Sequence, residues 1–297
     1  MIEVKVPATS ANVGPGFDCM GIAMSIYGVY RFSVIDEGLI VSGCPKEWQN
    51  EQNLVYQSCK RVFDDLQIPM LPLHIDIQAD AIPFARGLGS SAACIVAGVM
   101  GANALCGSRL SKAEMLTICS ELEGHPDNVA PAIYGGLTIS FQEGNKVLMT
   151  PCQVDKKFKF CAMIPDYPVL TEAARSVLPD SLPISDAVYN IGRSASLALA
   201  LSSGNSEMVA HACSDRLHQP YRKKLIVDYE MVGELCKQHG VLTWYISGSG
   251  STMMAISDND NVLASLKQDV CDRFPGWQVH CVAADENGAQ VLETCHG

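Results

Sequence analysis

The feature that most constrains this chain is a glycine-serine loop that leads directly into an apolar helix. The loop comprises Pro83, Phe84, Ala85, Arg86, Gly87, Leu88, Gly89, Ser90, Ser91, Ala92 and Ala93. Its glycines let the backbone turn its amides inward, and the start of a helix adds unpaired N–H groups and the positive end of the helix dipole. The loop is therefore predicted to bind a phosphate-like anion. Taken alone, it is equally compatible with an ordinary serine N-cap after a glycine turn.

Two common nucleotide-binding patterns are absent from the sequence. There is no G-x-x-x-x-G-K-[ST] segment, and no G-x-G-x-x-G with a partnering acid. The anion site must therefore belong to another class of fold. A serine hydroxyl beside a phosphate can also bind Mg²⁺, as the hydroxyl of a P-loop does.

Composition narrows the class of partner. The 297 residues include 21 Lys+Arg against 32 Asp+Glu, which gives a net charge of -11, and 48% are hydrophobic. A chain this apolar builds a substantial core rather than remaining disordered. Binding to a phosphate backbone needs a basic surface, so we predict no nucleic-acid partner.

The cysteines and the apolar segments indicate a cytoplasmic protein. The 13 cysteines are odd in number and include no C-x-x-C pair, which favours small buried side chains in a reducing compartment over disulfides or metal ligands. The amino terminus lacks the pattern of a signal peptide. No apolar stretch reaches the roughly 18 residues that a membrane helix needs, so we predict no membrane partner.

The spacing of apolar residues predicts an α+β fold in two domains, covering residues 1–154 and 155–297. Ser111 and Glu114 form a capping box that opens a helix, and Gly124 is placed to end that helix. Further helices are expected at 185–201, 206–218, 229–239 and 262–273, and strands at 242–246, 252–256 and 278–283. The strands are short and irregularly spaced, which disfavours a doubly wound sheet.

Two further segments accompany the glycine-serine loop. Residues 7–18 read PATSANVGPGFD and residues 247–252 read SGSGST. With the loop, in this order and separation, they resemble the three motifs of the GHMP kinase family, which includes galactokinase, homoserine kinase and mevalonate kinase. The third motif departs from the family's S-G-x-G-P-T pattern, because Ser251 replaces the proline.

The resemblance covers the whole chain and implies the fold and the nucleotide. It implies a GHMP kinase fold, with a ribosomal-S5-domain-2-like ATP-binding domain followed by a ferredoxin-like α+β domain. ATP and Mg²⁺ are the implied cofactors, with the ATP phosphates on the glycine-serine loop. An RNA-associated domain shares the amino-terminal fold, but the negative charge argues against it.

Within the family the chain is most similar to the homoserine kinases, through residues 12–18, EGHPDNVAP at 123–131, TEAAR at 171–175 and PYR at 220–222. This similarity implies ATP-dependent phosphorylation of the hydroxyl of L-homoserine, a step in threonine biosynthesis. The implied substrate-binding residues are Asn12, Asp18, His125, Thr171, Arg175, Arg222, Gly248 and Gly250. Another kinase of the family, acting on mevalonate or a sugar, and a non-catalytic sensor of ATP are the alternatives.

The chemistry of the residues agrees with a zwitterionic substrate. Asp18 and Asn12 suit an ammonium group, whereas the planar guanidinium groups of Arg175 and Arg222 suit a carboxylate. We expect Arg175 in the first turn of a helix capped by Thr171. The alternative for both arginines is a solvated surface position.

Metal and catalytic residues follow from the family as well. Ser91 and Glu121 are the predicted Mg²⁺ ligands, with Glu123 as the alternative carboxylate and a pair of exposed surface carboxylates as the simpler reading. Asp127 resembles the acid that relatives use as a base. Homoserine kinases have been viewed as lacking a true base, with Asn128 or Arg175 assisting the transition state. A homodimer is expected from the frequency of such assemblies.

Overall fold

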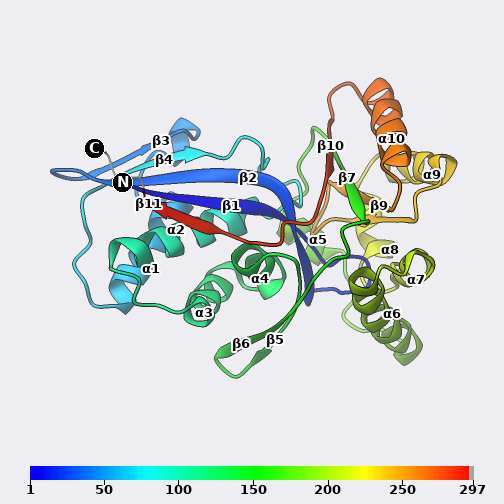
Figure 1. The fold of residues 1–297 in the computed structure, drawn as a ribbon, viewed down its shortest axis with the longest axis horizontal. Helices are drawn as coiled ribbons and strands as arrows, with labels where there is room; N and C mark the ends of the chain where they lie inside the picture. Colours follow the sequence, from blue (N-terminus) through cyan, green and yellow to red (C-terminus); the bar gives the residue numbers. More distant parts are fainter. Residues whose placement is uncertain (294–297) are drawn as a thin grey trace.

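The computed structural model describes residues 1–293, which form two β-sheets with helices packed against each (Figure 1). In this part of the chain the larger sheet has the order β11-β1-β2-β4-β3, with β5 beside β2 and β6 beyond β5. Its strands are β1 Ile2–Ala11, β2 Met20–Val34, β3 Leu39–Ser42, β4 Leu73–Gln78, β5 Leu137–Glu143, β6 Lys146–Cys152 and β11 Gln290–Glu293. The pairs are antiparallel, except that β3 and β4 run parallel.

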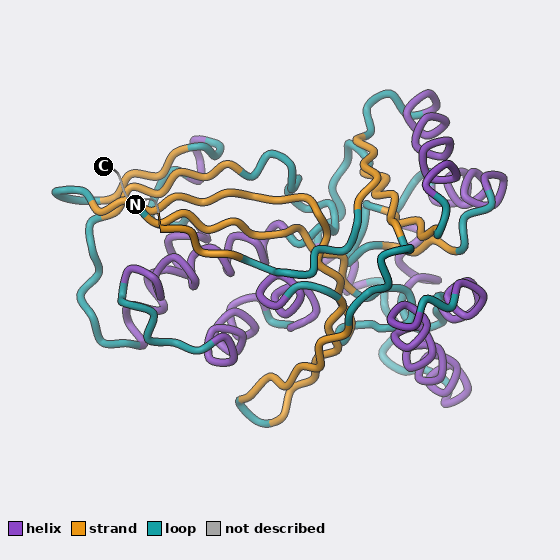
Figure 2. Tube along the Cα trace, in the orientation of Figure 1, coloured by secondary structure: helices purple, strands orange, loops and turns teal. Residues whose placement is uncertain are grey.

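A layer of helices lies along one face of this sheet (Figure 2). The layer contains α1 Leu54–Asp65, α2 Ser90–Leu105, α3 Lys112–Glu123 and α4 Pro126–Tyr134. Helix α2 contacts α1, α3, α4 and β1, and most of its side chains are buried. A helix that is apolar on all sides is stable only in such a central position. This placement fixes the start of α2, and with it the glycine-serine loop, against the end of β1.

The smaller sheet has the order β10-β7-β9-β8 and is antiparallel throughout. Its strands are β7 Lys159–Ile164, β8 Thr243–Ile246, β9 Met253–Ser257 and β10 Gln278–Val282. The helices of this half are α5 Thr171–Ser176, α6 Ile184–Ser203, α7 Ser206–Ala212, α8 Gln219–Arg222, α9 Tyr229–His239 and α10 Asp260–Arg273. Helices α9 and α10 pack with this sheet in a second apolar cluster, which includes Leu235 and Leu266.

The two halves share part of one core. The main apolar cluster contains Phe158 and Phe160 beside residues of the larger sheet such as Phe32. After β10 the chain returns to the larger sheet, where β11 pairs with β1. The predicted boundary between residues 154 and 155 lies just before β7, and it stays a prediction.

Local expectations are confirmed at some helix ends and wrong at others. The capping box of Ser111 and Glu114 is present, and Gly124 ends α3 in a left-handed conformation. The helix expected over 206–218 stops at Ala212, and the chain then turns around Asp215. The Asp215 carboxylate accepts hydrogen bonds from the backbone amides of residues 217–219. These amides therefore bond a side chain and not the carbonyls of a preceding helical turn, so the helix does not continue.

No helix within residues 1–293 combines the length and apolar character needed to cross a membrane.

Candidate active site

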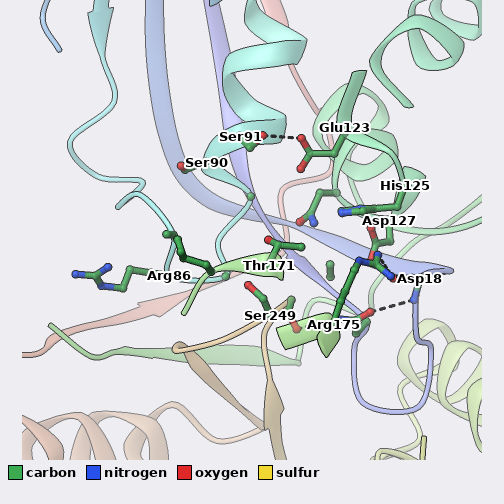
Figure 3. A pocket seen from close by; sticks show the side chains of 18 of the residues that line it. Asp18, Arg86, Ser90, Ser91, Glu123, His125, Asp127, Thr171, Arg175 and Ser249 are labelled. Atoms are coloured by element: carbon green, nitrogen blue, oxygen red, sulfur yellow. Dashed lines mark hydrogen bonds and ion pairs between the residues drawn. The ribbon is translucent and has the colours of Figure 1, made fainter. Parts of the chain in front are cut away.

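Three segments from distant parts of the chain meet at one pocket between the two halves (Figure 3). The Thr9 amide donates to the Leu88 carbonyl at 3.1 Å, which ties β1 to the glycine-serine loop. From the other side, the Ser247 hydroxyl donates to the Gly87 carbonyl at 2.6 Å, and the Thr252 amide donates to the Arg86 carbonyl at 3.0 Å. The three sequence motifs therefore form one continuous hydrogen-bonded unit.

The two glycines of the loop are required by both space and conformation. Gly87 and Gly89 have φ angles of 79° and 68°, in the left-handed region. A Cβ atom on Gly87 would lie 2.2 Å from the Ser247 carbonyl oxygen, and one on Gly89 would lie 2.0 Å from Thr9 Oγ1. Gly89 is also the N-cap of α2, with no side-chain cap. The structure therefore excludes a serine N-cap and leaves the first-turn amides of α2 at the pocket wall.

Arg86 anchors the loop. Its guanidinium donates to the backbone carbonyls of Pro165 at 3.0 Å, Phe84 at 3.1 Å and Asp166 at 2.6 Å. These contacts join the loop to the segment that follows β7. Arg86 thus stabilises the shape of the anion cradle through carbonyl groups.

Ser91 and Glu123 form a hydrogen-bonded pair in the pocket wall. The Ser91 hydroxyl donates to Glu123 Oε2 at 2.6 Å. Burial raises the pKa of Glu123, and the hydrogen bond from Ser91 opposes that effect. A carboxylate in this position is costly in the absence of a cation, so the site would favour a bound metal.

The structure places Glu121, the predicted metal ligand, outside this position. Glu121 accepts a hydrogen bond from Arg61 at 2.6 Å, and its side chain is 47% exposed. Glu123 lies two residues later, on another face of α3, and lines the pocket. Within residues 1–293 no group of three or more His, Cys, Asp or Glu side chains could hold a metal by itself.

His125 and Asp127 form a second pair at the start of α4. His125 Nδ1 lies 2.6 Å from Asp127 Oδ1, and the Asp127 side chain is only 2% exposed. Burial lowers the pKa of His125, but the hydrogen bond and negative charge of Asp127 outweigh burial, so the pKa lies above its ordinary value. In the next position, the Thr9 hydroxyl donates to Asn128 Oδ1 at 2.8 Å.

The opposite wall carries an acid and two arginines. Arg175 donates to both carboxylate oxygens of Asp18, at 3.0 and 3.1 Å. Asn12 donates to the Gly248 carbonyl at 2.9 Å and accepts from the Asp18 amide at 3.0 Å. Asp18 is therefore held at two points: its backbone amide bonds the Asn12 side chain, and its carboxylate bonds Arg175.

Arg222 is the buried cation of the site. Its guanidinium donates to the carbonyls of Gly248 at 2.9 Å and Ala174 at 3.1 Å, and it lies 5.0 Å from the centre of the Phe17 ring. Burial lowers the pKa of Arg222, and Asp18 opposes that effect. Within the described chain no ion pair joins it to an acidic side chain, so the site has unused capacity for an anion.

The structure corrects the placement of the helix that carries Arg175. Helix α5 begins at Thr171, so the N-cap is Leu170 and the Thr171 side chain makes no capping bond. Arg175 lies in the last turn of this short helix, where a cation is favoured by the helix dipole. Its position therefore needs no anion to explain it, although its contact with Asp18 remains.

Most of the predicted residues meet at the pocket. Those that line it are Asn12, Asp18, Phe84, Ala85, Arg86, Gly87, Gly89, Ser90, Ser91, His125, Asp127, Asn128, Thr171, Arg175, Arg222 and Gly248. The predicted residues outside its lining are Pro83, Leu88, Ala92, Ala93, Glu121 and Gly250. Leu88, Ala92 and Ala93 are buried in the core instead, because the loop and the first turn of α2 need an apolar underside.

Sequence reasoning missed three residues of the pocket wall. Ala11, Leu170 and Ser249 line it, each directly beside a predicted residue or motif. Ser249 lies between the two predicted glycines of the third motif, so motif membership was an available signal. Leu170 carries no sequence signal, because an apolar residue before a helix is usually a packing residue.

The arrangement separates two kinds of chemistry. One side offers backbone amides, the Ser91 hydroxyl and the half-buried carboxyl group of Glu123, which suit a polyphosphate with a divalent cation. The other side offers a carboxylate beside two guanidinium groups, which suits a small molecule that carries both charges. Between them lie His125 and Asp127 (Figure 3), and Asn128 also lines the pocket.

Comparisons with known proteins agree with this geometry. The family described as "GHMP kinases N terminal domain" matches residues 53–136, and "GHMP kinases C terminal" matches residues 196–276. A homoserine kinase of Clostridium botulinum (strain ATCC 19397 / Type A) is 42% identical over 297 residues, which is 99% of each chain.

Solved structures of kinases of this family have the same fold as this chain. The crystal structure of homoserine kinase from Cytophaga hutchinsonii has a TM-score of 0.88 and 28% identity, covering 98% of this chain and 97% of the other. The mevalonate kinase of L. major has a TM-score of 0.74 at 15% identity, covering 95% of each chain, and shows the fold alone.

The fit of Gly89 generates a testable prediction. Gly89→Ala should raise the dissociation constant for inorganic triphosphate by about tenfold or more, because strain of about 1–3 kcal/mol and the contact with Thr9 displace the cradle. Isothermal titration measures this constant. Gly107→Ala is the matched control: Gly107 has a φ of 80° but open space around its Cβ position, at the other end of α2. Equal weakening in both variants would contradict the prediction.

Proposed function

The chain belongs to the GHMP kinase family, and from this premise we propose that it transfers the γ-phosphoryl group of ATP to the side-chain hydroxyl of L-homoserine. The relatives that are about 42% identical over nearly its whole length are homoserine kinases. The product is O-phospho-L-homoserine, and the reaction is a step in threonine biosynthesis. The relatives disfavour the mevalonate, sugar and sensor alternatives.

The observation that carries this proposal is the juxtaposition of Asp18, Arg175 and Arg222. An amino acid bears its ammonium and carboxylate groups on the same carbon, so its site needs opposite charges close together. Asp18 and Arg175 already contact each other at 3.0 Å, and Arg222 is buried beside them. Mevalonate and sugars carry no ammonium group, so they offer Asp18 no positive charge beyond that of Arg175.

The assignment of the substrate groups follows from charge and geometry. The ammonium group of homoserine binds Asp18 and the side-chain oxygen of Asn12. The α-carboxylate binds the guanidinium groups of Arg175 and Arg222, which accept planar, bidentate partners. Arg222 is the stronger anchor, because its hydrogen-bond acceptors are backbone carbonyls and an anion would neutralise its buried charge. Thr171 and Gly248 complete the wall.

The triphosphate of ATP is held by the glycine-serine loop. The inward amides around Gly87 and Gly89 and the first turn of α2 donate to its oxygens. Because the loop is braced by Thr9, Ser247 and Arg86, these donors are in place before the nucleotide binds. Preorganised donors avoid the cost of reorientation during the reaction.

The residues present suit Mg²⁺. Ser91 and Glu123 supply two oxygen donors side by side, and Mg²⁺ is usually bound by one or two protein ligands together with phosphate oxygens and water. The absence of a three-ligand cluster in the described chain is therefore consistent with this ion. When bound, Mg²⁺ neutralises charge on the phosphates. Glu123 must then be ionised, which its burial alone disfavours.

Transfer itself depends mainly on position. The homoserine oxygen forms a bond to the γ-phosphorus, the bond from that phosphorus to the bridging oxygen breaks, and ADP leaves with the electron pair. The transition state is loose, so alignment and charge neutralisation contribute more than deprotonation of the hydroxyl. Asn128 lines the pocket and its amide oxygen is engaged by Thr9, so its amino group is left to assist the transferring group.

We assign Asp127 a positioning role. Its Oδ1 atom is already engaged by His125 at 2.6 Å, and it is one of the oxygens that would have to accept the proton. Asp127 thereby fixes the ring of His125 at the pocket wall, where His125 contacts the substrate. The hydroxyl proton passes to the departing phosphates or to water.

A cytoplasmic location and a homodimer stay predictions. Size-exclusion chromatography with light scattering would show whether the protein is a dimer, and a monomer at micromolar concentration would contradict that prediction.

A substrate panel tests the function. With ATP and Mg²⁺, the purified protein should phosphorylate L-homoserine and not mevalonate or galactose, because only homoserine matches both charges of the site. Phosphorus NMR identifies the O-phospho product, and a coupled assay for ADP gives the rate. Turnover of mevalonate without turnover of homoserine would overturn the proposal. ATP binding without any turnover would indicate a sensor.

The metal site is tested by a matched pair of variants. Glu123→Gln should raise the Mg²⁺ concentration needed for half-maximal rate by about tenfold, the effect of losing about 1.4 kcal/mol of charged interaction. Glu121→Gln should leave it within about twofold, because Glu121 binds Arg61 instead. A larger effect at position 121 would reverse the assignment.

The role of Asp127 is tested at saturating ATP and homoserine. Asp127→Asn keeps an oxygen acceptor for His125, so kcat should fall by no more than about tenfold, roughly 1.4 kcal/mol of barrier. Asp127→Leu removes the acceptor and should cost more. A general base contributes about 10²–10⁴-fold, so a loss of about a hundredfold or more in Asp127→Asn would show that Asp127 is the base.

A further inference from the structure

A fully buried histidine lies behind the substrate wall and belongs to none of the three motifs. His218 is 0% exposed, and its Nε2 atom lies 2.8 Å from the Gly14 carbonyl oxygen. Its ring stacks on Phe17, with ring centres 5.2 Å apart. Gly14 and Phe17 both belong to the loop that runs from Asn12 to Asp18. His218 thus contacts the substrate loop twice without lining the pocket.

The chemistry of these contacts defines the protonation state of the ring. A carbonyl oxygen only accepts, so Nε2 must carry the hydrogen. Nδ1 has no hydrogen-bond partner in the described chain. Burial lowers the pKa of His218, and the charge of Asp215 opposes that effect without reversing it. The ring is therefore a neutral imidazole that serves as a single directed donor.

His218 is itself held in place by a buried polar cluster. The side chain of Asp215 accepts from the His218 amide at 2.9 Å and from Asn190 at 2.6 Å. Asn190 also donates to the Pro15 carbonyl at 3.2 Å, and Ser194 donates to the same carbonyl at 2.7 Å. Two consecutive carbonyls of the substrate loop are thus bound from α6 and from the segment before α8.

The substrate loop needs such support, because its backbone is strained. Asn12, Val13 and Asp18 have φ angles of 69°, 39° and 55°, which are costly for residues with a Cβ atom. Gly14, at 70°, packs so closely that a Cβ atom there would lie 2.4 Å from the Cys213 carbonyl oxygen. Strain of this kind persists only where surrounding contacts fix it. Asp18, the proposed ammonium ligand, lies at the end of this strained segment.

His218 also fixes the second substrate anchor. It is the N-cap of α8, and its carbonyl accepts from the Arg222 amide at 3.0 Å. The same residue therefore sets the distance between the loop that carries Asp18 and the short helix that carries Arg222. No other described residue bonds to both the Gly14 carbonyl and the Arg222 amide.

We propose that His218 is a positioning residue for the amino-acid substrate: its Nε2–H group holds the Gly14 carbonyl and so sets the spacing of Asp18 and Arg222. This inference rests on the proposed function, since it concerns the affinity for homoserine. It predicts an effect on homoserine that ATP does not share, because the glycine-serine loop is braced separately by Thr9, Ser247 and Arg86.

The test compares two substitutions of His218 by steady-state kinetics. His218→Leu removes the donor and should raise the KM for homoserine by about tenfold, the effect of one lost buried hydrogen bond, with the KM for ATP within about twofold. His218→Gln places an amide donor near the same carbonyl and should bring the homoserine KM to within about threefold of the wild-type value. His239→Leu is the matched control, because His239 bonds Asp269 on α10, outside the pocket lining.

Each outcome decides the proposal. Equal increases in both His218 variants, or parallel increases in the KM values for homoserine and ATP, would show a purely structural role and overturn it. If His218→Leu does not fold, Ser194→Ala decides: a homoserine KM raised severalfold supports the proposal, and an unchanged KM overturns it. Wild-type protein without homoserine turnover overturns the proposed function and this inference together. Turnover with unaffected variants overturns this inference alone.

Discussion

The structure depends on the contact between the glycine-serine loop and the third motif. A hydrogen bond from the Ser247 hydroxyl to the Gly87 carbonyl joins residues that are 160 positions apart. The backbones approach so closely here that a Cβ atom at Gly87 would clash with the Ser247 carbonyl oxygen. This contact, with the Thr252–Arg86 bond, brings the smaller sheet against the start of α2. Anion donors from one half and substrate cations from the other then face one pocket. Without that contact, each half would carry only part of a site.

The two halves of the pocket meet different physical demands. The phosphate side uses backbone amides, whose direction is fixed by the loop and which bear no formal charge. The proposed substrate side uses Asp18 and Arg175, which pair with each other, and Arg222, which is buried without an acidic partner in the described chain. The charge of Arg222 is the more costly one, since it is buried beside the Phe17 ring and its hydrogen-bond acceptors are backbone carbonyls. Selectivity for an amino acid therefore resides in the substrate side, whereas the loop is common to any nucleotide kinase of this fold.

The sequence predicted the motifs well and their three-dimensional details less well. The anion loop, the capping box at Ser111 and the cluster of Asn12, Asp18, His125 and Arg222 follow from local chemistry and from family resemblance, and the structure brings them together. Glu123 lines the pocket and Glu121 does not, because two residues that are two positions apart on a helix differ by about 200° in direction, which residue type does not reveal. The cap predicted at Thr171 is wrong because α5 starts one residue earlier than expected, which makes Leu170 the N-cap. Ser251, which replaces the usual proline, donates to the Tyr167 carbonyl, a contact that spacing could not predict.

The buried layer behind the site was the least predictable part, and this has a physical reason. Asn190 lies on α6 and His218 in the segment before α8, and each donates to a backbone carbonyl of a loop near the start of the chain. Asp215 supports both by accepting from the Asn190 side chain and the His218 amide. Carbonyl acceptors leave no signature in side-chain sequence, so such partners are visible only once the chain has folded. Yet these bonds hold Asn12, Val13 and Asp18 in conformations that they would not adopt alone. A binding site places a charged ligand accurately only when neighbouring residues fix the rotamers and the backbone of the side chains that bind it. The positions of the charged groups in the substrate wall therefore depend on the hydrogen bonds that His218 and Asn190 donate to the carbonyls behind that wall.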